Sequence, residues 1–299
     1  MRFIALRHSE DGKRKQRLAS LRTWWMLAIF MSAGLLLGRL GICLLLATAS
    51  CIGWFEITRL LGTRQQDQFA IRAGYGLILI NYLLILFEMT SLYVVFLPLM
   101  SSMVFAVLLL IQDEPKGYIR STGALLWGML FLGYGVSHAA FLFTLPQTAS
   151  GPLGPAGWFL FLVILTECDD IFQAIVGRLF GNHKKHLIAP VISPNKTWEG
   201  FLGGMLIIVM LAPLLAPWLT TLGDQAGPWG LAEPLQPLVA PMLVALLISC
   251  AGFFGDINMS AIKRDAGVKD GSKLLAGMGG VIDRVDSLTM TAPVFVYFL

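Results

Sequence analysis

The chain has 299 residues, of which 56% are apolar and only 13% are charged, and its formal net charge is +4. Soluble domains carry about 25% charged residues, so this composition excludes an ordinary soluble protein and indicates a chain that crosses a membrane several times. We expect membrane lipids, and no nucleic acid, among its partners.

Nine apolar runs follow along the chain, and most approach the roughly 20 residues that a helix needs to cross the hydrocarbon of a bilayer. The runs are 24–37, 41–57, 73–87, 92–111, 121–144, 157–176, 201–219, 238–254 and 287–299. The first two could form one broken span, and the last is the shortest. We expect a single all-α membrane domain over residues 1–299, with about nine transmembrane helices.

Basic residues decide whether the first two runs are separate spans. With nine spans, every Lys and Arg except Arg39 falls on the same side of the membrane, whereas merging the first two scatters them over both faces. Because cytoplasmic loops carry the excess of basic residues, nine spans are favoured, with the N-terminus in the cytoplasm. The basic tail, residues 1–23, then serves as a topology signal and a contact for anionic lipid headgroups.

Several reactive side chains have a simple structural explanation. The four cysteines lie in apolar runs without the spacing of metal ligands, so we expect core or lipid-facing residues. His138 lies within a span and is expected to be a satisfied core residue. His183 and His186, on a basic loop, are expected to be solvated or to face phosphate rather than bind a metal. Glu56 and Glu88 lie at span ends and are expected at the membrane interface.

The functional residues are expected in the second half of the chain, 157–299. Two long cytoplasmic loops, 177–200 and 255–285, are rich in basic residues and are bordered by acids within the adjoining spans. A charge inside a membrane is costly, so such acids indicate a functional site. Since they share one membrane face and one depth, Asp170, Asp256, Asp283 and Asp286 could converge there.

Asp283 and Asp286 are three residues apart, which places both carboxylates on one face of a helix. Together with Asp256 they could hold Mg²⁺, whose remaining ligand positions phosphate would fill. The alternative is a pair of acids that stabilises a helix N-terminus. Gly279 and Gly280 precede the pair and would let backbone N–H groups approach an anion, although glycine-rich turns are common.

The segment 193–200 enters the seventh span. Ser193 is expected to cap this helix, with Pro194 in its first turn. Ser193, Lys196 and Thr197 could also hold a phosphate group, and both interpretations can be true because a helix N-terminus is itself an anion site.

The adjacent acids Asp169 and Asp170 lie inside the sixth predicted span, one helical turn before Gln173. Two neighbouring acids in hydrocarbon need partners, protonation or a cation. A buried hydrogen-bonded network and a cation site are both compatible with the pattern.

These motifs resemble the CDP-diacylglycerol synthase, or phosphatidate cytidylyltransferase, family. The matching residues are Ser260, Lys263, Arg264, Lys269, Asp270, Ser272, Leu275, Gly279, Gly280, Asp283, Arg284 and Asp286. The segments 170–181 and 193–200 also resemble the family in the same order, whereas the first half matches only in being hydrophobic. Met278 stands where the family usually has histidine, and it can neither donate to a phosphate nor move a proton. The loop between Gly181 and Ser193 is also a few residues longer than is usual in the family.

The resemblance implies that CTP and phosphatidate react to give CDP-diacylglycerol and pyrophosphate. It implies a bacterial-type enzyme of the inner membrane with its active site facing the cytoplasm, and a homodimer is compatible with it. A Mg²⁺ ion on Asp256, Asp283 and Asp286 is implied, and a second cation, divalent or monovalent, could complete the site. The implied catalytic residues are Asp256, Asp283, Asp286, Lys263 and Arg264. The implied substrate-binding and phosphate-binding residues are Ser193, Lys196, Thr197, Ser260, Lys269, Asp270, Gly279, Gly280 and Arg284, and Asp170 would line the cavity.

Three other functions compete with this one. A transporter would use Asp169, Asp170 and Asp256 along an ion path, but the gathering of charge at one membrane face argues against it. A catalytically weak relative would act by binding lipid or protein, and Met278 supports it. A polyprenol kinase would use CTP on another lipid and release CDP, whereas a cytidylyltransferase releases pyrophosphate.

Overall fold

A computed structural model describes residues 2–146, 151–182, 185–222, 236–269, 271–272, 274–275 and 279–299 of the chain. The side chains of residues 2–17 and 236 are outside this description. Of the residues discussed above, the description therefore omits His183, Asp270 and Met278, together with the side chains of most of the basic tail.

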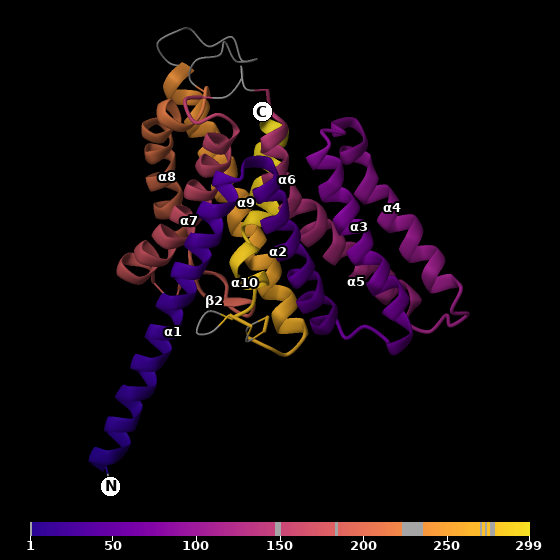
Figure 1. The fold of residues 1–299 in the computed structure, drawn as a ribbon. Helices are drawn as coiled ribbons and strands as arrows, with labels where there is room; N and C mark the ends of the chain where they lie inside the picture. The colour runs from indigo at the N-terminus through magenta and orange to yellow at the C-terminus, as the bar shows by residue number, and fades with distance from the viewer. Residues whose placement is uncertain are drawn as a thin grey trace.

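The protein is an all-α membrane protein, as predicted (Figure 1). Its α-helices are α1 (Arg2–Leu36), α2 (Gly38–Leu60), α3 (Gln68–Leu86), α4 (Thr90–Leu110), α5 (Tyr118–Gly128), α6 (Val136–Phe141), α7 (Pro155–Phe180), α8 (Trp198–Leu219), α9 (Gln236–Asp265), α10 (Ile282–Val285) and α11 (Leu288–Phe298). Shorter helical segments are η1 (Gln65–Asp67), the π-helix η2 (Met129–Gly135) and η3 (Leu142–Thr144). The start of α1 and the end of α11 lie at opposite ends of the bundle (Figure 1).

Seven helical segments within the described residues are long and apolar enough to cross a membrane. They are Leu18–Leu36, Gly38–Leu60, Gln65–Leu86, Thr90–Leu110, Tyr118–Thr144, Trp198–Leu219 and Pro237–Asp265. The predicted sixth and ninth spans correspond to α7, which carries three acids, and to α11, which has only 11 residues. The count of nine spans and the orientation of the chain therefore stay predictions.

The first two predicted spans are two separate helices rather than one broken span. The chain turns at Leu37 and Gly38, where Gly38 adopts a φ of +63° that a residue with a Cβ rarely takes. The two helices then pack against each other at Gly34 and Gly41. The glycines therefore explain both the turn and the close approach of α1 to α2.

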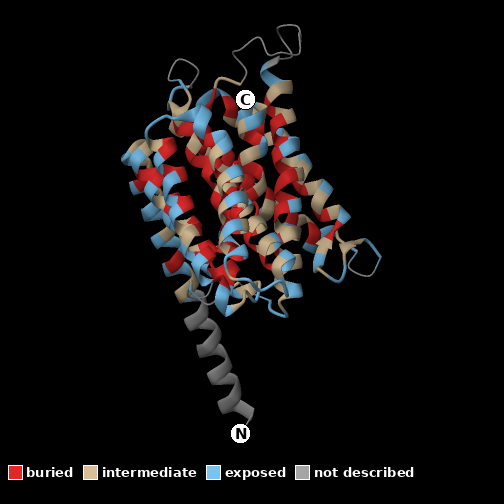
Figure 2. Cartoon of the chain, turned by 90° about the vertical axis from the view of Figure 1, so that its right-hand side faces the viewer, coloured by how far each residue is buried: buried red, intermediate tan, exposed pale blue. Residues whose placement is uncertain are grey.

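Apolar side chains cover the outside of the bundle as well as its interior. Figure 2 shows buried residues facing the middle of the bundle and exposed residues facing outward. Many of the exposed residues are large and apolar, such as Leu36, Ile111, Ile119 and Trp218. A soluble monomer rarely exposes so continuous an apolar surface, whereas lipid covers it in a membrane. The burial pattern thus agrees with an integral membrane protein.

The core contains most of the side chains that were expected there. Cys43 is buried, the other three cysteines (Cys51, Cys168 and Cys250) are partly buried, and all four are free thiols. His138 is buried, and its Nδ1 lies 2.8 Å from the backbone oxygen of Tyr134. Its Nε2 has no hydrogen-bond partner, so the expectation of a fully satisfied core histidine is wrong for that atom.

The segment expected to start the seventh span is a strand instead. β1 (Leu187–Ala189) and β2 (Ser193–Thr197) form an antiparallel hairpin with Leu187 opposite Thr197 and Ala189 opposite Ser193. Ser193 is therefore not the helix cap. Thr197 takes that role, because it keeps extended backbone angles and its hydroxyl accepts a hydrogen bond of 3.2 Å from the Gly200 N–H.

Gly74 and Gly76 on α3 offer a matched test of this packing. A methyl group at Gly74 would lie 2.7 Å from the fully buried ring of Trp54 on α2, whereas one at Gly76 meets nothing within 4 Å. We expect Gly74→Ala to lower the free energy of unfolding by about 1–3 kcal/mol because the core is overpacked. Gly76→Ala is expected to be neutral or slightly stabilising. Melting temperatures in detergent measure both, and equal values would contradict the close contact of α2 with α3.

Candidate active site

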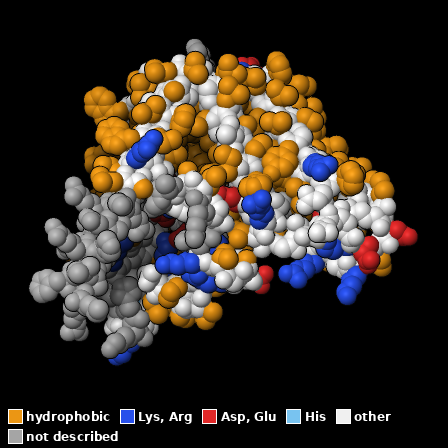
Figure 3. Space-filling view, turned by 60° about the horizontal axis from the view of Figure 1, so that its bottom comes forward, with side chains coloured by type: hydrophobic (Ala, Val, Ile, Leu, Met, Phe, Trp, Pro, Cys, Tyr) orange, Lys and Arg blue, Asp and Glu red, His pale blue; other side chains and the backbone are white. Residues whose placement is uncertain are grey.

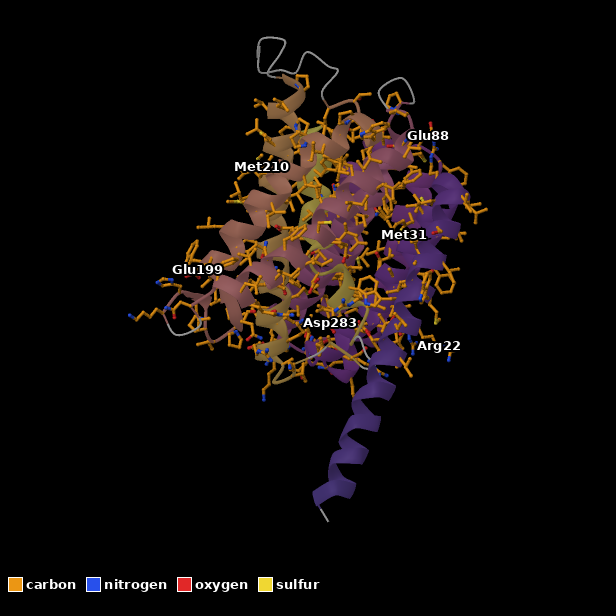
Figure 4. The ribbon with its side chains drawn as sticks, turned by 90° about the vertical axis from the view of Figure 1, so that its left-hand side faces the viewer. Arg22, Met31, Glu88, Glu199, Met210 and Asp283 are labelled. Atoms are coloured by element: carbon orange, nitrogen blue, oxygen red, sulfur yellow. The ribbon has the colours of Figure 1, made fainter. Side chains whose placement is uncertain are left out.

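The predicted functional residues gather at the end of the bundle where α1 begins, and we call this the polar end. Helices α7, α9 and α10, the β1–β2 hairpin and the end of α2 contribute to it. Figure 3 looks onto this end and shows Lys and Arg side chains over it, with apolar side chains on the flanks. In Figure 4, Asp283 lies toward the same end as Arg22, while Glu88 lies at the other end.

The two adjacent acids of α7 have different surroundings. Asp169 is buried and accepts hydrogen bonds from Ser249 Oγ at 3.0 Å and from Gln173 Nε2 at 2.8 Å. Asp169 therefore belongs to a buried hydrogen-bonded network. Asp170 accepts a hydrogen bond of 2.7 Å from Ser287 Oγ and interacts electrostatically with Asp256, so it faces the other acids.

Lys196 reaches from the hairpin into this group of acids. Its ammonium group lies 2.9 Å from Asp256 Oδ2 and 3.2 Å from Gln173 Oε1, and only 19% of the side chain is exposed. Burial lowers the pKa of Lys196, but the charges of Asp256 and Asp170 outweigh burial and raise it above its ordinary value. Lys196 is therefore a protonated lysine fixed beside these carboxylates.

Asp256, Asp170 and Asp286 form a group of carboxylates that repel one another. Burial, together with the charges of Asp256 and Asp170, raises the pKa of Asp286 to about 8. Asp286 accepts a hydrogen bond from the Ser287 N–H, and Asp256 accepts one of 3.4 Å from Ser260 Oγ. This donor set fits a hard divalent cation, because Mg²⁺ prefers oxygen ligands and would relieve the repulsion. Within the described part of the chain, no group of three or more acids, histidines or cysteines is already arranged to bind a metal ion.

Asp283 lies in different surroundings from Asp256 and Asp286. Its Oδ1 is 2.7 Å from Lys263 Nζ, and its Oδ2 accepts hydrogen bonds from the N–H groups of Gly280 at 2.8 Å and Gly271 at 3.0 Å. Burial raises the pKa of Asp283, but these contacts outweigh it and leave the pKa below its ordinary value. Each oxygen of the Asp283 carboxylate thus already has donor partners.

The remaining predicted residues lie around the rim. Arg264 donates to the backbone oxygens of Ile192, at 3.3 Å, and Val268, at 3.1 Å, so it connects α9 to the hairpin. Lys269 and Arg284 are exposed, and Arg284 lies near Asp170. Ser193 is partly buried in β2. Gly279 precedes Asp283 with a φ of +85°, a value that glycine adopts most easily.

Two polar contacts near the hairpin are structural. His186 is exposed, and it pairs with Glu199 at the start of α8 rather than being open to phosphate. The Thr197 hydroxyl was expected to hold phosphate. It is buried and already accepts the hydrogen bond that caps α8. Lys196 is thus the side chain of this segment that points to the acids.

Sequence reasoning missed two acids at this end. Glu56 was expected at the interface, but it is only 3% exposed and accepts hydrogen bonds from the N–H groups of Val281 at 3.1 Å and Ile282 at 2.9 Å. Glu167, one turn before Asp170, interacts electrostatically with Asp170 and Arg284. Glu56 lies at the cytoplasmic end of its predicted span and Glu167 lies within the sixth predicted span, two residues before Asp169. Nearness to the membrane face predicted for the other acids could have identified both. Glu88, in contrast, is exposed at the end of α3 and pairs with Arg39, as an interfacial residue would.

The chain is similar to known proteins over nearly its whole length. The model of the Cytidylyltransferase family matches residues 16–299. The chain is 38% identical over 279 residues to the uncharacterized protein YnbB of Escherichia coli, which covers 93% of this chain and 86% of that protein. It is 34% identical over 190 residues to the phosphatidate cytidylyltransferase of Chlamydia pneumoniae (63% of this chain, 58% of the relative).

A third relative is the phosphatidate cytidylyltransferase of Haemophilus influenzae, which is 35% identical over 141 residues. That match covers 46% of this chain and 44% of the relative, so the chain spans about half the length of the phosphatidate cytidylyltransferases it matches. The family match covers nearly the whole chain, including α2 and Glu56. The chain therefore belongs to the cytidylyltransferase family and is a nucleotidyltransferase of the membrane.

Proposed function

We propose that the protein transfers the cytidylyl group of CTP to phosphatidate and forms CDP-diacylglycerol and pyrophosphate. The observation that carries this proposal is the meeting of Lys196 with Asp256, beside Asp170 and Asp286, at the polar end of an apolar bundle. A lipid phosphate reaches this depth from the bilayer, and CTP reaches it from water. We also propose that this end faces the cytoplasm of a bacterial inner membrane.

The reaction joins two anions, so charge neutralisation and alignment are its main requirements. An oxygen of the lipid phosphate attacks the α-phosphorus of CTP, and the bond from that phosphorus to the bridging oxygen of pyrophosphate breaks. The lipid phosphate is already ionised near neutral pH, so the residues need not remove a proton. Lys263, Arg264, Lys269 and Arg284 supply positive charge for the phosphate oxygens.

Asp256 and Asp286 are the residues that would hold Mg²⁺, with Asp170 beside them. Bound Mg²⁺ would supply neutralisation of the phosphate charge. The sequence had assigned Asp283 to the same ion, but its contacts with Lys263, Gly271 and Gly280 support a role in shaping the glycine-containing segment. Lys196 holds the positive charge beside Asp256 and Asp170.

The test uses purified protein in mixed micelles with phosphatidate and labelled CTP, with Mg²⁺ or with EDTA. We expect Mg²⁺-dependent formation of CDP-diacylglycerol and pyrophosphate in equal amounts. Release of CDP with a phosphorylated lipid would contradict the proposal and identify a kinase.

A second arm replaces phosphatidate by other lipid phosphates. The uncharacterized YnbB matches most of the chain, whereas the phosphatidate cytidylyltransferases named above match about half to two thirds of it, so another acceptor is the specific alternative. If another lipid phosphate gives product and phosphatidate gives none, the proposed cytidylyl transfer stands but its lipid acceptor is a different one.

A further inference from the structure

Glu56 contacts the part of the chain that carries the signature although it lies more than two hundred residues earlier. The Glu56 carboxylate, at the end of α2, accepts hydrogen bonds from the N–H groups of Val281 and Ile282 and from the hydroxyl of Ser272. The side chain is buried, so these contacts are shielded from water. One buried acid thus joins Ser272 to Val281 and Ile282 within this segment.

The contact is close enough to restrict the residue at position 280. A methyl group on Gly280 would lie 2.7 Å from Glu56 Oε2 and 2.8 Å from Oε1. Any larger side chain would therefore displace the carboxylate or the segment. The Glu56 carboxylate therefore leaves room only for glycine at position 280.

Asp283 holds the same segment from its other side. It accepts hydrogen bonds from the N–H groups of Gly271 and Gly280, and it pairs with Lys263 on α9. Within the segment, the Leu275 N–H donates to the Gly279 oxygen at 2.9 Å. Two carboxylates from different helices thereby clamp residues 271–272 against residues 280–282.

We infer that Glu56 is a positioning residue of the nucleotide site, one that holds Ser272 against Val281 and Ile282, beside the residues proposed to bind the phosphates of CTP. The inference rests on the proposed function for the identity of the nucleotide. Both Glu56 oxygens accept hydrogen bonds from N–H or O–H groups, so the carboxylate acts on the segment rather than as a ligand of substrate. The first half of the chain therefore contributes to the site through α2.

The experiment compares Glu56→Ala and Glu56→Gln with Glu88→Gln, a control with the same chemical change at the opposite end of the bundle. The N–H groups of Val281 and Ile282 donate to different oxygens of Glu56. Glutamine has one carbonyl oxygen and can accept from only one of them, so its effect is expected to lie between those of the wild type and Glu56→Ala. Glu56→Ala is expected to raise the KM for CTP about tenfold, to change kcat by less than about threefold, and to leave the KM for lipid unchanged.

Hydrogen–deuterium exchange gives a second readout that needs no activity. Glu56→Ala, and Ser272→Ala to a smaller extent, are expected to speed exchange at residues 279–282 and to leave α3 and α4 unchanged. Faster exchange throughout the bundle would show a general structural role and contradict the inference. A Glu56→Gln protein that uses CTP as well as the wild type would also contradict it, because the two acceptor oxygens would then not both be needed.

The two proposals fail in different ways. If the wild-type protein forms no CDP-lipid from any lipid phosphate, the proposed function fails, while the exchange at residues 279–282 still decides whether Glu56 holds the segment. If the wild type is active and the Glu56→Ala protein has normal CTP kinetics, the positioning role fails and the proposed function stands.

Discussion

Asp256→Asn is expected to lower kcat/KM for CTP about a thousandfold while the protein still inserts and folds. The substitution removes the charge that pairs with Lys196 at 2.9 Å and one of the carboxylates proposed to hold Mg²⁺. Asparagine has nearly the same shape and keeps one oxygen, so packing on α9 is preserved. Steady-state kinetics over a range of Mg²⁺ concentrations measure the effect, and melting temperature reports the fold.

Asp265→Asn is the matched control for that variant. Asp265 lies at the exposed end of the same helix, and the substitution changes the charge by the same amount. We expect its kinetics to equal those of the wild type. If the kcat/KM of Asp256→Asn is within about threefold of the control, Asp256 neither binds the metal ion nor takes part in the reaction.

Asp283→Asn is expected to impair both turnover and stability. The substitution leaves the Lys263 ammonium, only 12% exposed, without its ionic partner, and it weakens the hydrogen bonds from Gly271 and Gly280. Breaking a buried pair in this way costs about 3 kcal/mol of unfolding free energy. We expect about a hundredfold loss of kcat/KM, because Gly271 and Gly280 are no longer held together beside Lys263. Melting temperature and kinetics, compared with Asp265→Asn, measure the two effects.

Lys263→Ala separates the two roles of this pair. Asp283 keeps both backbone donors in that variant, so the stability loss should be smaller than in Asp283→Asn, while use of CTP still weakens. An equal loss of stability in both variants would show that the hydrogen bonds from the Gly271 and Gly280 N–H groups to Asp283 do not contribute to stability.

The pH dependence of stability has a definite sign at Asp283. Because its pKa is lowered in the folded protein, the stability it contributes is present above its ordinary pKa and is lost as the pH falls through the lower folded value. The wild type should therefore lose stability below about pH 4, and Asp283→Asn should lose less over the same range.

The sequence predicted the helices well because long apolar runs and the placement of basic residues are local signals. It also identified the residues that meet at the polar end, including Lys196, Asp170, Asp256 and Asp286. It did not predict the hairpin at β1 and β2, since the strands are short and Pro194 resembles a helix start. Thr197, rather than Ser193, caps the helix, and that choice depends on strand pairing with a segment ten residues away.

Other features depend on contacts that no local pattern contains. Asp283 and Asp286 share a spacing that suggests one metal site, but Lys263 and two glycine N–H groups engage Asp283. Glu56 lies in the half of the chain that carries no motif, and its partners are about 225 residues later. Only the three-dimensional packing of α2 beside α10 reveals that role.

The acids of α7 also bear on how the protein enters the bilayer. An isolated α7 would place Glu167, Asp169 and Asp170 in the bilayer, where a charged side chain costs up to about 2.5–3.5 kcal/mol at the centre and less toward the interface. In the folded protein, Ser249 on α9 and Ser287 beside α11 each donate to one of these acids, and Lys196 lies beside them. The hydrogen bonds that lower this cost for Asp169 and Asp170 thus come from parts of the chain that follow α7. We therefore expect α7 to be more stable in the membrane once these later helices have inserted beside it.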